Sequence, residues 1–326
     1  MKILKGEAVS VSLEGVEESP GPYAMSFGFD LKGLIRSIER IGVVNSPLID
    51  RDEEGRIRIV AGYRRILALK GLRREEALCI DLSASRLTAV EKLHLNLYDN
   101  LATREFNEVE KGMILEALSR HHGKEEILSF HMPLLGLPAH ESQLKIFLSL
   151  GGLEEEIRLA LARKRVSFKT VQSLMEMSPE SRSVVFKWLS SLSFTFSQQI
   201  QFLAFIDDIS CNDDKGIPDL LSRTDLVAIL DNQGLNRPQK AKSVLERLRV
   251  MRYPSLSLAE KAFRIAAKDL KLPNGVEVRH PPYFEGPGYS LQISFRDGRE
   301  LRRKLIELSS MKGLENLGDP WKSDHE

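Results

Sequence analysis

The sequence has few of the features that mark membrane, secreted or metal-scaffold proteins. Its 326 residues include two cysteines, Cys79 and Cys211, which are far apart and form no CxxC pair, so neither a disulfide framework nor a zinc site is predicted. No apolar run approaches the ~18 residues of a membrane span, and the N-terminus has no signal-peptide hydrophobic region, so we expect a cytoplasmic protein with no membrane contact.

The chain also lacks a strong charge of either sign. Its 47 lysines and arginines nearly balance 46 aspartates and glutamates, for a formal net charge of +1. This balance is unusual for a mainly electrostatic nucleic-acid binder, but it allows local basic patches on one domain. The composition, 42% hydrophobic and 29% charged, is typical of a globular protein long enough for two or three domains.

Common catalytic and metal-binding motifs are missing as well. The sequence contains no P-loop and no nucleophile elbow. His121, His122 and His131 have no cysteine or carboxylate at ligand spacing. We therefore expect exposed or helix-capping histidines and not a metal site.

The most distinctive segment is a strand-like run that ends in a glycine and enters a helix carrying two arginines. Residues 56–61 alternate in polarity, Gly62 follows, and Arg64 and Arg65 lie in the first turn of the helix-like run. Glycine lets backbone N–H groups approach a ligand, a helix N-terminus attracts anions, and arginine matches phosphate oxygens. The pattern predicts a phosphate-binding turn. The alternative is that the two arginines are an ordinary solvated helix start.

The segments around this turn occur in an order known from one protein family. Upstream lie an amphipathic helix pattern ending at Gly42 and a proline-containing strand pattern, and downstream lies an Asn-Leu segment followed by Asn-x-x-Glu. This order resembles the N-terminal domain of the ParB family of chromosome and plasmid partition proteins. In that family a Gly-Glu-Arg-Arg box and a Glu-Asn-Leu-x-Arg box face bound CTP and Mg²⁺. Gly62, Arg64 and Arg65 match the first box, and Asn100, Leu101 and Glu110 match the second.

The resemblance implies a set of site residues with CTP and Mg²⁺ as cofactors. Asn100 and Glu110 would face the phosphates or the metal ion. The residues implied to contact the nucleotide are Gly62, Tyr63, Arg64, Arg65, Asp99, Asn100, Arg104 and Glu110.

Departures from the family pattern bear on activity. Tyr63 replaces a glutamate implicated in nucleotide hydrolysis, and Asp99 replaces the glutamate of the second box. Thr103 falls at the usual arginine, with Arg104 one residue later, and residues 22–30 lack the cation of a third family box. We therefore expect a nucleotide-binding switch with at most weak CTPase activity.

The chain divides by pattern into three parts, which together predict an α+β fold. Residues 1–98 are predicted to form a small α/β ParB-like domain with strands at 43–49 and 56–61. Residues 99–250 have a helical pattern with no convincing strand, which predicts an all-helical DNA-binding domain.

Within the helical part, residues 125–150 form two helical patterns across the turn Gly136-Leu137-Pro138. This spacing suits a helix-turn-helix, whose second helix would present Ser142, Gln143 and Lys145 to a DNA major groove. An ordinary helical hairpin is the alternative. The order of segments in the ParB family, which places a helix-turn-helix here, favours DNA binding.

A basic run follows the helix-turn-helix and includes Lys164 and Arg165, which could contact DNA phosphates or simply form a solvated face.

In residues 251–326 the all-helical pattern ends, and the sequence predicts a helix followed by a β-β-α module. Val276, Val278, Leu291, Ile293 and Phe295 would form one apolar face, and because a two-stranded sheet alone is marginal in water, that face needs cover. The module resembles the dimerisation module of ParB proteins; the alternative is docking on the chain's own helices.

The sequence thus predicts a ParB-like, nucleotide-dependent DNA clamp or switch, nucleoid-associated and homodimeric, with a ParA-type ATPase as a possible partner. One alternative is a ParB-fold kinase or nuclease, for which Glu75, Glu76 and Asp99 are the nearby candidate bases. Another is a mobile-element DNA-binding regulator whose nucleotide pocket has degenerated.

Overall fold

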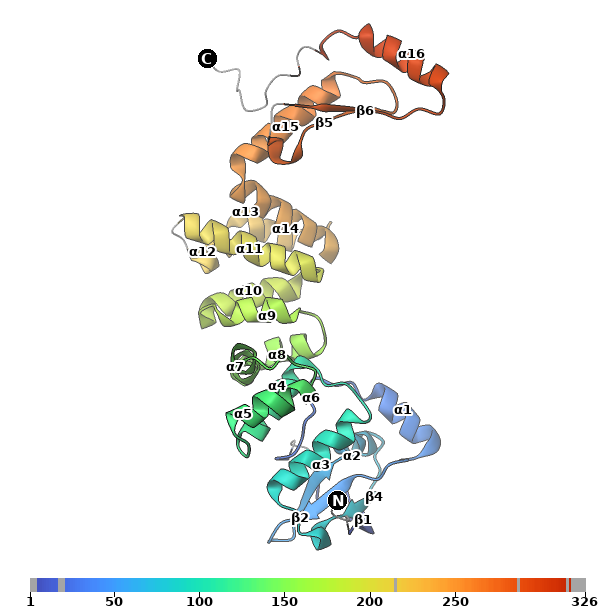
Figure 1. Cartoon of the computed structure of the whole chain (residues 1–326), viewed down its shortest axis with the longest axis vertical. Coiled ribbons are helices and arrows are strands. Elements are labelled where there is room, and N and C mark those ends of the chain that lie inside the picture. The colour runs from blue at the N-terminus through green and yellow to red at the C-terminus, as the bar shows by residue number, and fades with distance from the viewer. Residues whose placement is uncertain (1–4, 17–20, 214–215, 286–287, 315–316, 318–326) are drawn as a thin grey trace. The chain divides into compact units, whose positions relative to one another are not determined.

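We describe a computed structural model of the chain, which covers residues 5–16, 21–213, 216–285, 288–314 and 317. The chain forms two compact units, Met1–Arg182 and Ser183–Glu326, and each is described by itself (Figure 1). Helices and two small sheets make up the fold, in agreement with the predicted mixed α and β class. Among the described residues, no helix has both the length and the apolar character needed to cross a membrane.

The first unit contains a four-stranded sheet. Its strands are β1 (Glu7–Ser12), β2 (Leu48–Arg51), β3 (Ile57–Ala61) and β4 (Glu76–Asp81). The strand order is β1-β4-β2-β3, in which β4 runs antiparallel to β1 and parallel to β2, while β2 and β3 are antiparallel. The strand pair β2 and β3 matches the two strands predicted from the sequence, whereas β1 and β4 were not predicted. In β4 the buried residues Ala77 and Cys79 are small, whereas the large apolar residue Leu78 is 61% exposed. The large apolar residue therefore does not mark the buried face of this strand.

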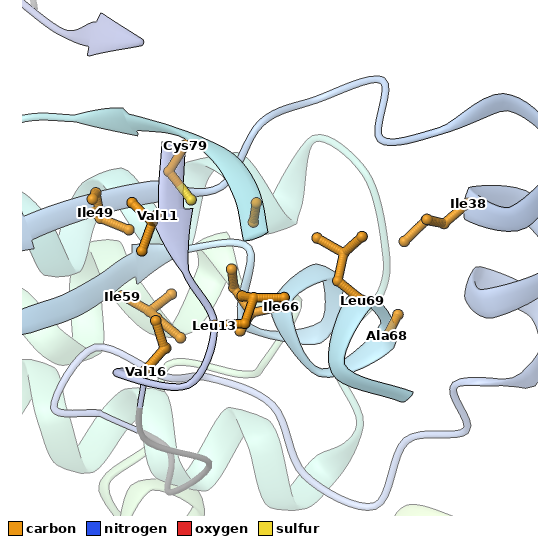
Figure 2. Close-up of a cluster of buried hydrophobic side chains, with 11 residues drawn as sticks. Val11, Leu13, Val16, Ile38, Ile49, Ile59, Ile66, Ala68, Leu69 and Cys79 are labelled. Carbon is orange, nitrogen blue, oxygen red and sulfur yellow. The ribbon is translucent and has the colours of Figure 1, made fainter. Parts of the chain in front are cut away.

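Two helices, α1 (Lys32–Ile41) and α2 (Tyr63–Gly71), pack with this sheet around one apolar core. Figure 2 shows Ile66 and Leu69 of α2 and Ile38 of α1 together with side chains from the strands. Because Ile66 and Leu69 are buried in this core, α2 is fixed against the sheet. The junction between β3 and α2, where the predicted phosphate turn lies, therefore has a defined position.

The next two helices, α3 (Ala89–Leu101) and α4 (Glu108–Ser119), each begin with a complete capping box. The short 3-10 turn η1 (Ser83–Ser85) leads into α3. Asn96 of α3 donates from its buried amide to the carbonyl of Val60 in β3, which holds the helix against the sheet. In α4 the capping residues are Asn107 and Glu110, so the Asn-x-x-Glu motif also sets where this helix starts.

The predicted helix-turn-helix region contains two helical segments. The first is continuous from α5 (Lys124–Glu126) through the π turn η2 (Ile127–His131) to α6 (Met132–Leu134), and the second is α7 (Glu141–Ser149). Between them, Gly136 adopts a left-handed φ of 70°. A Cβ atom at Gly112 of α4 would lie 2.6 Å from the Phe147 carbonyl oxygen, so glycine permits the close packing of α7 on α4.

The expectation that the histidines of this region are exposed or capping is wrong for two of them. His131 is 1% exposed, and its side chain lies with those of His94 and His122. The stated lack of a carboxylate is also wrong, because Glu126 Oε1 lies 3.0 Å from Nδ1 of His122. His94, which no sequence pattern singled out, reaches this cluster from the separate helix α3.

Further helices complete the first unit and the helical part of the second. They are η3 (Leu150–Gly152), α8 (Glu155–Ala162), α9 (Phe168–Met175), α10 (Pro179–Ser191), α11 (Phe196–Asp213), α12 (Ile217–Leu221), α13 (Thr224–Asp231), α14 (Arg237–Arg252) and α15 (Pro254–Asp269). No strand occurs between positions 99 and 250 in the described part of the chain, as the sequence pattern predicts. Helix α15 starts at Pro254, because proline is well accommodated in the first turn of a helix.

The end of the second unit has the predicted strand, strand, helix order. Its elements are β5 (Val276–Arg279), the turn η4 (Pro282–Phe284), β6 (Ser290–Ile293) and α16 (Gly298–Ser309). The strands are antiparallel, with Val276 opposite Ile293 and Val278 opposite Leu291. Val276 and Val278 are buried, whereas Leu291 is 49% and Phe295 51% exposed. Part of the expected apolar face is therefore uncovered within the chain.

Candidate functional site

The β3–α2 junction is built around Gly62. Its φ of 92° is left-handed, and a Cβ atom there would lie 3.0 Å from the Cα of Pro47. Both features favour glycine, because other residues would be strained in φ and crowded against backbone. The tight turn brings the first turn of α2, with Tyr63, Arg64 and Arg65, to the wall of a cavity.

This cavity has a volume of about 310 Å³ and is lined by parts of the first unit that are far apart in sequence. The β3–α2 junction, the end of α1 with the loop that follows it, and the end of α3 all contribute. No carboxylate is among the described residues that line it. The lining residues include Ser26, Ser37, Asn45, Gly62, Tyr63, Arg64, Arg65, Asn96, Asn100, Thr103 and Arg104.

Arg64 and Arg104 share one carboxylate behind the cavity wall. Glu110, 1% exposed, accepts from Arg64 Nη2 at 2.5 Å on one oxygen and from Arg104 Nη1 at 2.7 Å on the other. The same two oxygens accept from the backbone N–H groups of Phe27 and Asn107, each at 3.0 Å. Glu110 therefore holds two guanidinium groups in fixed positions at the cavity wall.

Arg65 is held by a different set of partners. Its Nη2 donates to Asp99 Oδ2 at 3.0 Å, and its Nη1 donates to the Asn45 carbonyl at 2.6 Å. Its side chain is 21% exposed and that of Asp99 35%, so this ion pair is open to solvent, unlike the one at Glu110. A ligand anion could therefore compete with Asp99 for Arg65.

Arg104 connects α3 with the segment that precedes α1. Its Nε donates to Asn100 Oδ1 at 2.7 Å, and its Nη2 donates to the Met25 carbonyl at 2.6 Å. Residues 22–30, which have no cation of their own, are thus contacted by a guanidinium from elsewhere in the chain. Sequence reasoning identified Arg104 as a site residue but gave no reason for its contact with Met25, because that contact spans 79 positions.

The cavity wall is electropositive. Two carboxylates, Glu110 and Asp99, pair with the three guanidinium groups, so one positive charge within this cluster is uncompensated. Burial and then the neighbouring Arg104 lower the pKa of Arg64, while Glu110 raises it. Because its ordinary pKa is far above neutrality, Arg64 stays charged. Three fixed cations around one cavity suit a polyvalent anion.

The structure brings together all eight residues implied by the resemblance. Six line the cavity: Gly62, Tyr63, Arg64, Arg65, Asn100 and Arg104. Asp99 and Glu110 instead contact the cavity's arginines from outside the lining. Asn100 lines the cavity, but its amide oxygen accepts from Arg104 and its amide nitrogen donates to Asn96. Both Glu110 oxygens also accept hydrogen bonds, and a metal role for either residue stays a prediction.

Two features of this site were missed. The Asn45 and Ser46 carbonyls accept from Arg65, and the Ser26 hydroxyl accepts from Arg64 Nε at 3.1 Å. Backbone carbonyls are present in every residue, so the sequence cannot identify Asn45 and Ser46 as partners of Arg65. The helix stop at Gly42 is the sequence signal that a loop follows α1.

The candidate bases of the kinase or nuclease alternative are not positioned to take a proton from a ligand in this cavity. Glu75 and Glu76 are outside its described lining, and Glu76 accepts from the Ser10 hydroxyl on β1 at 2.6 Å. Asp99 is engaged by Arg65. The arrangement therefore suits binding of an anion more than proton abstraction.

The predicted DNA-contacting residues also lie in the first unit. Ser142 and Lys145 are exposed on α7, Gln143 is half-buried, and Lys164 and Arg165 are exposed after α8. Glu141 forms ion pairs with both Lys124, at 2.6 Å, and Lys145, at 3.3 Å. The hydrogen bonds from these lysines hold the pKa of Glu141 below its ordinary value. The start of α7 thus presents cations beside one acidic group.

Comparisons with known proteins give distant similarities of structure. No protein-family model and no curated protein matches the chain. The chain is similar to the C-terminally truncated chromosome-partitioning protein ParB from Caulobacter crescentus complexed with CTP-gamma-S, with 19% identity over 53% of this chain and 94% of that one and a TM-score of 0.27. It is also similar to the truncated ParB of the same organism complexed with the centromeric parS site, with 15% identity over 59% and 96% and a TM-score of 0.31. Both are distant likenesses of fold.

Proposed function

We propose that this chain is a ParB-like protein that binds a nucleoside triphosphate, CTP by family resemblance, and uses it to regulate binding to double-stranded DNA. One observation carries the proposal: Arg64, Arg65 and Arg104 converge on a single cavity whose described lining contains no carboxylate. These cations come from the two segments that resemble the family's nucleotide boxes.

The arginines have distinct roles in this proposal. Arg65 exchanges the solvent-accessible Asp99 for a phosphate, whereas Arg64 and Arg104 are held ready by the buried Glu110. Mg²⁺ bound to a triphosphate keeps most of its ligands from phosphate and water and needs one or two protein oxygens. Asn100 is the predicted metal residue that lines the cavity, and Glu110 serves to orient the arginines.

Nucleotide occupancy would reach the DNA-binding region through α4. Glu110 lies in the first turn of α4, and Gly112, two residues further on, packs against Phe147 of α7. A phosphate that draws Arg64 or Arg104 away from Glu110 would alter the start of the helix on which α7 rests. A ligand with different affinity for the two arrangements would then shift their populations.

The DNA and assembly parts of the proposal rest on surfaces. Ser142, Gln143 and Lys145 would read the major groove while Lys164 and Arg165 contact phosphates. The domain limits 1–98, 99–250 and 251–326 are retained as proposed functional boundaries. The exposed Leu291 and Phe295 support a homodimer, because a second copy would cover them. A ParA-type ATPase is the partner that the resemblance suggests.

Isothermal calorimetry of the full chain with Mg·CTP tests the central part of this proposal. We expect saturable binding of one CTP per chain, weakened in Arg104→Gln and unchanged in the matched variant Arg40→Gln, which alters an arginine on α1 outside the cavity. Mg·ATP, Mg·GTP and Mg·UTP serve as comparisons for base preference. No binding of any of the four, or equal affinity in both variants, would remove the proposal.

DNA binding is tested by sequencing genomic fragments retained by the full chain. We expect enrichment of a two-fold-symmetric motif that is lost in the double variant Ser142→Ala, Gln143→Ala, with phosphate-driven binding still reduced by salt. CTP should change the retained amount in the wild type. Identical retention with and without CTP would favour the mobile-element regulator with a degenerate pocket.

A further inference from the structure

A cluster of three histidines lies outside the cavity described above. His94 is on α3, His122 follows α4, and His131 is in the π turn η2. One ring nitrogen from each lies within 4.8 Å of the other two, and Nε2 of His94 and Nε2 of His122 are 3.1 Å apart. Three segments of the first unit therefore deliver imidazoles to one point.

His131 is the most unusual member of the cluster. It is 1% exposed, and both of its ring nitrogens are buried without a hydrogen-bond partner in the described part of the chain. Buried polar atoms in native proteins are nearly always satisfied, so an unpartnered pair on one ring indicates a ligand. The π turn accounts for the direction of this side chain, since π turns redirect residues within a helix and are frequent at functional sites.

We propose that His94, His122 and His131 bind one divalent transition-metal ion of the Zn²⁺ class. Neutral imidazoles are preferred ligands of zinc, copper and nickel ions and poor ligands of Mg²⁺. For Zn–N bonds of about 2.0–2.1 Å in a tetrahedron, neighbouring ligand atoms are about 3.3 Å apart. The 3.1 Å between His94 and His122 is close to that value, and His131 reaches it by a small movement within the 4.8 Å cluster.

Glu126 supplies the outer contact that histidine ligands usually have. Its Oε1 is 3.0 Å from Nδ1 of His122, the nitrogen opposite the one that faces His94. A carboxylate that accepts from Nδ1–H fixes the tautomer whose Nε2 is free to bind metal. The same oxygen is 4.0 Å from Nε2 of His131, so Glu126 also lies next to the metal position.

The electrostatics of the cluster favour the ligand form of the rings. Burial, followed by the neighbouring His122, lowers the pKa of both His94 and His131, while Glu126 acts in the opposite direction. The charge of the exposed His121 adds to the lowering of the His94 pKa. The lowered pKa of His94 and of His131 favours the neutral imidazole that metal binding requires.

A metal ion here would connect the helix that reaches the nucleotide cavity with the helix-turn-helix region. His94 is on the helix that ends with Asp99 and Asn100 at the cavity, and His131 is on the first helix of the helix-turn-helix region. Because the ion would bind α3 to that helix directly, it would stabilise one packing of the two segments. Metal binding by the three histidines requires neither nucleotide nor DNA.

The test uses Co²⁺ as a spectroscopic probe on the full chain carrying no added histidines. We expect one Co²⁺ per chain with visible absorption typical of nitrogen ligands, displaced by one equivalent of Zn²⁺. Glu126→Gln should weaken Zn²⁺ binding about 10–100-fold, as loss of an outer contact usually does, and His94→Ala or His131→Ala should weaken it more. His121→Ala, an exposed neighbour of the cluster, is the matched control and should bind as the wild type does.

Each outcome decides the proposal. No Co²⁺ absorption in the wild type at pH 7.5, or equal affinities in wild type and His94→Ala, would overturn it. Since His131→Ala could unfold a buried site, His94→Ala carries the decision: His94 is partly exposed, and circular dichroism of the metal-free variant checks its fold. Weaker binding by a folded His94→Ala, together with wild-type binding by His121→Ala, supports the site.

Discussion

Replacing Glu110 by glutamine should reveal how strongly one buried carboxylate holds the cavity's arginines. Glu110 is 1% exposed and pairs with Arg64 at 2.5 Å and Arg104 at 2.7 Å. Glutamine keeps the size and the capping ability of the side chain at the start of α4, since capping boxes accept either residue. The substitution therefore removes the charge while leaving the cap in place.

The magnitude follows from the burial of the partners. Removing one member of a fully buried ion pair costs about 3–5 kcal/mol, because the other charge is left uncompensated. Here the Arg64 side chain is 27% and that of Arg104 16% exposed, so water partly screens the orphaned charges. We expect a loss of about 2–4 kcal/mol in the local unfolding free energy. Glu116→Gln, which breaks the exposed pair with Arg120 on the same helix, should cost no more than about 0.5 kcal/mol.

Hydrogen exchange of the α4 amides is the suitable assay. Both tryptophans, Trp188 and Trp321, lie beyond residue 182, so tryptophan fluorescence would report on the other unit. Inorganic triphosphate should protect α4 more in Glu110→Gln than in the wild type, because the freed guanidiniums gain an anion. A loss below about 1 kcal/mol in the local unfolding free energy would refute the orienting role of Glu110. Weaker protection of α4 by triphosphate in Glu110→Gln than in the wild type would also refute it, and would favour Glu110 as a metal ligand.

Three further predictions concern binding, turnover and assembly. Arg65→Ala should weaken CTP binding about 10–100-fold by calorimetry, because it removes a charge-assisted contact worth about 1.5–3 kcal/mol, whereas Arg36→Ala on α1 should not. Phosphate release from CTP should stay near background with saturating DNA, because Tyr63 offers no carboxylate to orient water; a DNA-stimulated turnover that Tyr63→Phe leaves unchanged would assign hydrolysis to another residue. Light scattering should find a dimer at micromolar concentration and a monomer for the double variant Leu291→Asp, Phe295→Asp, and a wild-type monomer would contradict the dimer.

Local patterns predicted the parts of the site that are close in sequence. A strand, a glycine and two arginines occur within ten residues, so Gly62, Arg64 and Arg65 could be placed correctly relative to one another. The two strands that were not predicted, β1 and β4, are each six residues long, and in β4 the inward residues Ala77 and Cys79 are small. Hydrophobic periodicity reports the size of side chains, and it fails where small residues form the core face.

Contacts between distant segments were beyond the reach of sequence reasoning. Arg104 donates to the Met25 carbonyl, 79 positions away in the sequence. Asn45 accepts from Arg65 through its backbone carbonyl, a group that every residue type has. The histidine cluster was missed for the same reason, since His94 precedes His122 by 28 positions on a different helix. Ligand spacing within one segment finds metal sites only when the ligands share that segment.

A crystal structure of the full chain with Mg·CTP would test the central claim most directly. The account predicts phosphate oxygens within about 3 Å of the guanidinium groups of Arg64, Arg65 and Arg104, with Asp99 released from Arg65 and Glu110 still beneath the cavity wall. Triphosphate bound elsewhere on the chain, or a cavity that keeps all three arginines on their present partners at saturating CTP, would contradict it.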